Sequence, residues 1–231
     1  FRFFHFLQQM MWGKKWYYDY LVFLKNNGIH PVDAINEIII KCKSDKKNKM
    51  YNIFNAFIKD YTEAESFSTY DKLKEYWSKP KNFQRLKDGE YGKLNSLYTF
   101  EVVLRHREDF KKLLLGLKET FIKENKIENL EDFSKAYEEV VIFQESLHVK
   151  IDKNLKVQNE YSKEFEFDFI NWRNKNYDKL QKMKSNKIVN FYTKPKQKEF
   201  LEQQFKQYKS NNYIHTLRMM SVDSDPWQFT Y

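Results

Sequence analysis

The sequence has few of the residues that form cross-links and tight turns, and it has no long apolar run. Its 231 residues include 1 cysteine, 4 prolines and 5 glycines. A single cysteine excludes an internal disulfide, so we expect a reducing compartment and a cytoplasmic protein. Few glycines and prolines disfavour an all-β fold, which needs many tight turns. The uncharged run Phe3–Gly13 is much shorter than the ~20 residues of a membrane helix, and no signal-peptide pattern is visible, so no membrane partner is expected.

Aromatic residues, by contrast, are abundant. The chain contains 21 Phe, 16 Tyr and 5 Trp, which is enough for a sizeable core and argues against intrinsic disorder. Most of the apolar residues before residue 148 recur at helical spacing, which predicts a series of amphipathic helices. The predicted helical segments are Phe3–Met11, Trp16–Leu24, His30–Ile40, Met50–Tyr61, Ser68–Trp77, Leu97–Leu104, Phe110–Ile122 and Asn129–Leu147.

The hydrophobic period changes near Glu164. Acidic and aromatic residues alternate strictly over Glu164–Phe169, which predicts a strand with one aromatic face. Ile188–Thr193 and Trp227–Tyr231 are two further predicted strands, and Lys196–Tyr208 is a predicted helix between them. We therefore predict a mainly α (α+β) fold. A multi-helix body (residues 1–148) is followed by a small subdomain (149–231), in which an antiparallel sheet packs with helices, and the two form one compact unit. Because the sequence begins with Phe1 and not Met, we also expect a fragment of a longer chain.

Signatures of nucleotide or metal binding are weak. Gly89-x-x-Gly92-Lys93 only loosely resembles a phosphate-binding loop and follows no predicted strand, so it is interpreted as a turn. Glu145 and His148 have the Glu-x-x-His spacing of di-iron helical bundles, but there is no second copy of the motif. His148 is therefore expected to be a surface or capping residue, and no metal ligand is assigned. The other histidines, His5, His30, His106 and His215, are scattered.

Side chains for acid–base or nucleophilic catalysis also have simpler explanations. Glu164, Glu166 and Asp168 could be paired acids in a cleft, which would make the chain a stand-alone metal or carboxylate enzyme. The solvated face of an alternating strand explains them without chemistry and is the preferred interpretation. Cys42 lies among lysines that could lower its pKa, but no catalytic partner can be assigned, so it is interpreted as an incidental thiol.

The strongest basic signal lies between Arg173 and Lys198. The net charge of the chain is 41 − 32 = +9, and eight lysines between Lys175 and Lys198 face a single acid, Asp178. Basic side chains interleaved with aromatic residues could hold a single nucleic-acid strand by charge and stacking, so an RNA- or DNA-binding module is an alternative function. A solvated sheet edge whose lysines discourage aggregation is the commoner explanation. The residues of the nucleic-acid alternative are Arg173, Lys175, Lys182, Lys184, Lys187 and Tyr192.

One stretch carries a family resemblance. Gly89–Asn95 leads into Leu97–Glu101 and then Arg107–Phe110, an order that resembles the C-terminal region of cobalamin-binding radical S-adenosylmethionine (SAM) proteins. Those regions often show a short glycine turn into a helix, a helical pair and then an aromatic strand, here Phe165–Phe169. A helix near Phe200–Tyr208 and a closing segment, Trp227–Tyr231, also resemble that layout, so the likeness covers about residues 80–231. Gly89, Tyr91, Gly92 and Asn95 are then a structural junction that sets the following helix into the core.

The family's catalytic motifs are absent from this sequence. It lacks both C-x-x-x-C-x-x-C and the cobalamin-binding D-x-H-x-x-G, and a single cysteine cannot supply the thiolates of an iron–sulfur cluster. The resemblance therefore implies an accessory domain downstream of a catalytic core in the same polypeptide, covering that core and shaping substrate access. S-adenosylmethionine, the 4Fe-4S cluster and cobalamin would belong to the core, with no catalytic or cofactor-binding residue here. Phe3–Met11 and Trp16–Leu24 are expected to lie nearest that core, because their aromatic content exceeds what a lone domain usually exposes.

Overall fold

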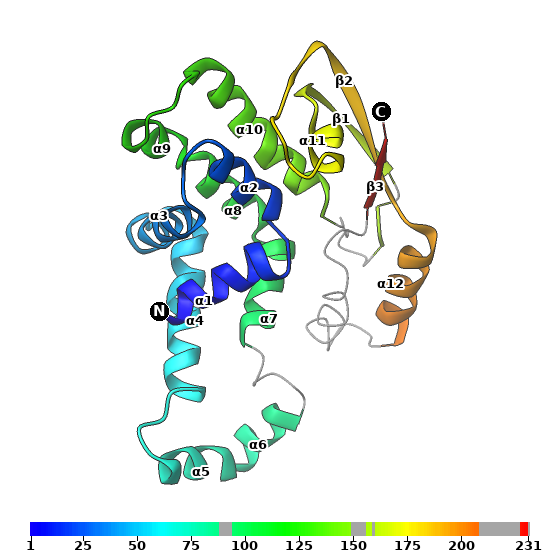
Figure 1. Cartoon of the computed structure of the whole chain (residues 1–231). Helices are drawn as coiled ribbons and strands as arrows, with labels where there is room; N and C mark the ends of the chain where they lie inside the picture. Colours follow the sequence, from blue (N-terminus) through cyan, green and yellow to red (C-terminus); the bar gives the residue numbers. More distant parts are fainter. Residues whose placement is uncertain (88–93, 149–155, 159, 208–226, 231) are drawn as a thin grey trace.

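The computed structural model describes residues 1–87, 94–148, 156–158, 160–207 and 227–230, and it shows a helical body followed by a sheet (Figure 1). The first part contains α1 (Arg2–Gln8), the π-helical segment η1 (Gln9–Gly13), α2 (Tyr18–Asn26), α3 (Pro31–Ser44), α4 (Lys49–Ala64), α5 (Tyr70–Ser78) and α6 (Pro80–Lys87). Then follow α7 (Leu94–Phe100), the π-helical segment η2 (Glu101–Arg105), α8 (Arg107–Leu115), α9 (Lys118–Glu124) and α10 (Leu130–Ser146). The last part contains β1 (Glu160–Phe167), α11 (Phe169–Asn174), β2 (Lys182–Thr193), α12 (Pro195–Gln207) and β3 (Trp227–Thr230). The predicted fold class, mainly helical with a small antiparallel sheet near the C-terminus, is confirmed.

One hydrophobic core joins the helices to the sheet. Its buried side chains run from Phe3 in α1 to Phe191 in β2, and they include much of α2, α8 and α10. Phe6, Met11 and Tyr20 are fully buried within this core. The aromatic side chains of the first two predicted helices are thus largely used inside this chain. Their aromatic content therefore gives no reason to place these helices against another polypeptide.

The sheet is antiparallel, in the order β1-β2-β3. Phe165 and Phe167 of β1 are buried against α10, whereas Glu164 is exposed, so the predicted alternation is confirmed. The predicted C-terminal limit of this strand was wrong. The Asp168 side chain accepts a hydrogen bond from the Asn171 N–H at 3.0 Å, so it caps α11 and places Phe169 in that helix.

A carboxylate of α10 holds the sheet at an irregular point. The β1–β2 register shifts between Phe165 and Phe167. There the Glu139 carboxylate accepts hydrogen bonds from the Glu166 N–H, at 2.8 and 3.0 Å, and from the Phe167 N–H at 3.1 Å. Burial raises the pKa of Glu139, and the two backbone N–H groups oppose that rise because they stabilise the charged form. One side chain therefore supplies the acceptors that the irregular strand lacks.

Helices α5 and α6 stand apart from the rest of the body, at the lower end of α4 (Figure 1). We call this pair, Tyr70–Lys87, the α5–α6 arm. The Asn82 side chain donates a hydrogen bond to the Tyr76 carbonyl at 2.9 Å and so ties the two helices together. No side chain of α5 is buried. No helix within the described ranges is long and apolar enough to cross a membrane.

We expect Glu139→Ala to destabilise the protein by about 1–3 kcal/mol, because it leaves the N–H groups of Glu166 and Phe167 without an acceptor. Glu139→Gln should cost less, because its amide oxygen keeps one acceptor. Urea unfolding measures both changes. Glu131→Ala is the control on the same helix, because its exposed ion pair with Lys135 should contribute less than about 1 kcal/mol. Equal losses of stability for Glu139→Ala and Glu131→Ala would contradict the role of Glu139 as the acceptor at the register shift, or bulge, of β1.

Candidate functional site

Only one residue of the predicted junction lies in the described part of the chain. Gly89, Tyr91 and Gly92 lie outside the described residues. Asn95 is buried in the first turn of α7, where its Nδ2 donates to Oε1 of Gln9 at 2.5 Å. This hydrogen bond fastens α7 to η1.

A buried polar cluster lies at the C-terminal end of α10. We call Tyr17, Arg107, Glu145 and His148 the Glu145 cluster. The Tyr17 hydroxyl donates to Oε1 of Glu145 at 2.6 Å, and Nε of Arg107 lies 3.3 Å from Oε2. Nδ1 of His148 is 3.9 Å from Oε1 of Glu145, and its Nε2 is 2.5 Å from the Trp16 carbonyl oxygen.

Two π-helical segments precede the residues that reach Glu145. After η1, the Tyr17 N–H bonds to the Met11 carbonyl, which makes a wide turn at the start of α2. Within η2, the His106 N–H bonds to the Glu101 carbonyl at 3.0 Å, and α8 then begins at Arg107. Such π turns are frequent at functional sites. Here they immediately precede the residues that meet at α10.

Burial shifts both titratable groups of the Glu-x-x-His motif towards their neutral forms. It raises the pKa of Glu145 to about 7, against the opposing effects of the Tyr17 hydroxyl and the Arg107 guanidinium. It lowers the pKa of His148 to about 3, so this imidazole is neutral at neutral pH and donates its Nε2–H to Trp16. The prediction of a surface or capping histidine was wrong, because the exposed fraction of His148 is 0%.

The pairing of Arg107 with Glu145 makes the Glu145 cluster a structural ion pair rather than a metal site. Within the described ranges, no three His, Cys, Asp or Glu side chains are placed to hold a metal ion. The Arg107 guanidinium lies where such an ion would approach the Glu145 carboxylate, and the two cations would repel each other. The cluster can therefore store a proton near neutral pH, and it joins α2, α8 and α10.

A groove of about 1020 Å³ lies in the described surface. Its walls are the loop Lys126–Asn129 and the segment Asp178–Lys182, and the end of α2, Asn26–Gly28, closes one side. None of the Glu145 cluster lines it. A smaller hollow of about 70 Å³ also borders Trp172 and the segment Asp178–Gln181. The floor of the groove consists of Phe23, Phe133, Ala136, Phe167 and Trp172.

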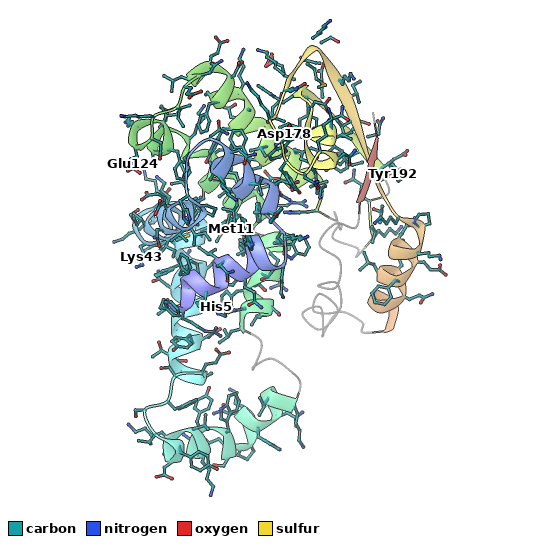
Figure 2. All side chains as sticks on the ribbon, in the orientation of Figure 1. His5, Met11, Lys43, Glu124, Asp178 and Tyr192 are labelled. Carbon is teal, nitrogen blue, oxygen red and sulfur yellow. The ribbon has the colours of Figure 1, made fainter. Side chains whose placement is uncertain are left out.

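A buried aspartate fixes the wall that contains Asp178, which Figure 2 shows near α11. Asn176 and Tyr177, just before it, both have left-handed backbones, with φ of 54° and 60°. This conformation costs about 1–2 kcal/mol for a residue other than glycine. The Tyr177 hydroxyl donates to Asp19 at 2.7 Å, and Nε of Arg173 lies 3.3 Å from the other carboxylate oxygen of Asp19. These contacts hold the strained turn against α2.

The six residues of the nucleic-acid alternative do not form one surface. Arg173 pairs with the buried Asp19. Lys182 lies 3.5 Å from the Asp132 carboxylate and 3.3 Å from that of Glu166. Both cations are therefore engaged in ion pairs that support the fold.

The remaining four residues are spread over α11 and β2. Lys175, Lys184 and Lys187 are exposed, and Lys187 lies opposite the buried Phe165 in the register. Tyr192 is half-buried and lies beside β3 (Figure 2). Tyr192, the aromatic residue named with these lysines, thus lies near the opposite end of β2 from Lys184.

The candidate acids and the thiol of an enzyme site are either exposed or already engaged in the fold. Glu164 is exposed on β1, Glu166 pairs with Lys182, and Asp168 caps α11. Cys42 is buried, which raises its pKa to about 12. The expectation that nearby lysines could lower this pKa was wrong, because burial disfavours the thiolate.

A search of family models, of curated proteins and of solved structures finds no match to this chain. Sequence reasoning missed the groove, the buried Asp19 and the half-buried Arg107. The sequence did contain a signal for Asp19. It is a single acid within the aromatic stripe Trp16–Leu24, where a buried charge needs a partner.

We expect Glu145→Gln to remove part of the pH dependence of stability. The folded-state pKa of Glu145, about 7, exceeds its unfolded value of about 4.3, so the folded state keeps a proton that the unfolded state loses. The free energy of unfolding should therefore fall as pH rises through this window, by up to about 1.4 kcal/mol per pH unit. Glutamine cannot titrate, so the variant lacks this decline. Urea unfolding between about pH 5 and about pH 7 measures the difference.

The titration of His148 changes the stability with pH in the opposite direction to that of Glu145. Its folded pKa lies below its unfolded value, so its contribution is present above about pH 6.5 and is lost as pH falls. The wild type and Glu145→Gln share the contribution of His148. The difference between their slopes of unfolding free energy against pH therefore isolates the contribution of Glu145. Identical slopes for the two proteins would contradict the raised pKa.

Proposed function

We propose that this chain is a non-catalytic accessory domain of a larger radical-SAM, cobalamin-dependent enzyme, and that it docks on the catalytic core through the α5–α6 arm. The core would hold S-adenosylmethionine, the 4Fe-4S cluster and cobalamin. The order of elements from residue 94 onward supports this proposal in part, because helices α7 to α10 are followed by the aromatic strand β1, whereas the resemblance has only a helical pair after its first helix. The ion pair of Glu166 and the capping role of Asp168 also support a role other than catalysis.

The observation that carries the docking proposal is the exposed apolar surface of the α5–α6 arm. The exposed fractions are 73% for Tyr70, 36% for Leu73, 47% for Phe83 and 40% for Leu86. A contiguous group of exposed apolar side chains is typical of an interaction site. Because the arm stands away from the body (Figure 1), another surface can cover it without rearranging the core.

The charge of the arm indicates the kind of surface that it meets. Its sequence contains six cations and two acids, so its net charge is 6 − 2 = +4. Complementary charge at the edge of an interface speeds association and suppresses wrong partners. The docking surface on the catalytic core is therefore apolar at its centre and acidic at its edge. The six cations are Lys72, Lys74, Lys79, Lys81, Arg85 and Lys87, and the acids are Asp71 and Glu75.

We expect the arm to become protected in the complete enzyme. Hydrogen exchange of residues 70–87 should be at least about tenfold slower in the product of the complete reading frame than in this chain alone, because docking suppresses local opening. Leu73→Lys combined with Phe83→Lys should abolish that protection. Ile40→Lys is the matched control, because Ile40 is exposed on α3, outside the arm.

Two results would contradict the proposal separately. A complete reading frame without an upstream C-x-x-x-C-x-x-C motif would remove the family assignment. Unchanged exchange in the arm, with the motif present, would remove only the docking surface.

The second candidate function is a basic nucleic-acid-binding module, favoured by the exposed lysines on the first half of β2. If it is correct, Lys184→Gln and Lys182→Gln should each lower the salt concentration that elutes the protein from heparin, because each removes a phosphate contact. If Lys182 only supports the fold, Lys182→Gln should lower the stability by about 1 kcal/mol and leave retention close to that of wild type. Absence of retention at low salt would remove this function.

A further inference from the structure

We propose that the groove is a binding site for a short peptide segment that is close to neutral in net charge and carries one aliphatic anchor side chain. This inference does not depend on the proposed accessory role. It rests on the charge of the groove, the nature of its floor and walls, and a buried donor beneath one wall.

The charged side chains of the groove balance each other. It is lined by three cations and three acids, so its formal charge is zero. Nucleic acid and anionic lipid need a surplus of positive charge, which this groove lacks. Its occupant is therefore close to neutral. The cations are Lys126, Lys179 and Lys182, and the acids are Glu128, Asp132 and Asp178.

The floor suits an aliphatic side chain better than a flat ring. The rings of Phe23, Phe133 and Trp172 are each about 3% exposed, so they offer no open ring face on which a sugar could stack. The aliphatic lining residues that are only half-buried are Ile127 and Leu180, and they form the small apolar patch that remains at the surface. One leucine-sized side chain that packs on this patch is a single anchor.

The walls suit a peptide backbone. Lys126–Asn129 and Asp178–Gln181 lie outside the helices and strands, although the Ile127 and Asp178 N–H groups and the Asn129 and Gln181 carbonyls are bonded within the chain. Gln181 is exposed and adds an amide side chain to the rim. This amide can donate and accept hydrogen bonds, as a peptide also requires. A volume of about 1020 Å³ is at the upper end of the range for small-molecule sites, which favours an extended occupant.

A buried donor lies between the two hollows. The Nε1–H of Trp172 is buried and has no hydrogen-bond acceptor among the described residues. Such a group is destabilising until an acceptor is supplied. Asp178, Lys179 and Gln181 border both hollows, of about 1020 Å³ and about 70 Å³, and so does Trp172. A peptide carbonyl is an acceptor of the kind that this indole N–H lacks.

The test follows the indole N–H resonance of Trp172 in the ¹⁵N-labelled protein, assigned by its absence in Trp172→Phe. The probes are N-acetylleucine amide, N-acetylglycine amide and maltotriose. A ligand as small as N-acetylleucine amide should bind with a Kd of about 1 mM or weaker and shift this resonance. N-acetylglycine amide should bind about tenfold more weakly, because it lacks the anchor. The Trp16 resonance is the internal control, because Trp16 contacts His148 away from the groove.

Two variants test the donor. Trp172→Phe keeps an apolar ring but removes the N–H, so it should weaken N-acetylleucine amide severalfold, read from the methyl resonances of Leu180 in the groove. Trp77→Phe, a tryptophan of the arm, should leave the affinity unchanged. The comparison of probes in the wild type decides the proposal even if Trp172→Phe fails to fold. Equal affinity for the two amides, no shift with either of them, or a shift with maltotriose alone would overturn it.

Discussion

The need to satisfy polar side chains along the buried helix α10 determines how the other elements are placed. The α10 side chains Glu139, Gln144 and Glu145 hydrogen-bond to three different partners: the β1 bulge, the Asp19 N–H and the Tyr17 hydroxyl. A buried polar group without a partner would cost about 1–3 kcal/mol. Each of these hydrogen bonds therefore determines which element packs next to α10, and it also stabilises that packing. The sheet and the start of α2 are thus located by the polar groups of one helix, while apolar packing supplies most of the driving force.

The groove is a consequence of the same arrangement. The Tyr177 and Arg173 side chains reach Asp19, which lies one residue after the start of α2, so the chain before β2 must turn sharply across that helix. The turn needs two left-handed residues, and it leaves Asp178–Lys182 separated from the loop before α10. A strained turn held by a buried carboxylate is thus what keeps the groove open. The arm takes no part in this network and is free to serve a different surface.

The part of the fold that could be predicted is the part set by local periodicity. Helical spacing found most of the helices, but it missed α6 and α11 and joined α8 and α9 into one predicted helix. The alternation of Glu164–Phe167 identified the buried face of β1. Periodicity could not identify Glu145 as a buried acid, because its partner Tyr17 is 128 residues away in the sequence. Arg173 was grouped with surface lysines for the same reason, since Asp19 is equally distant along the chain. The exposed face of the arm was also hidden, because an amphipathic pattern shows that a surface will be covered but not what covers it.

The positions of the charged groups argue for binding rather than chemistry at the groove. A catalytic acid or base has to reach the reacting group directly or through one water. Glu145, whose pKa of about 7 would suit proton transfer, is buried and does not line the groove. Of the charged residues that do line it, Asp132 and Lys182 are already paired with each other. The arm and the elements that form the groove lie at opposite ends of the molecule (Figure 1), so the two proposed binding surfaces would not compete with each other.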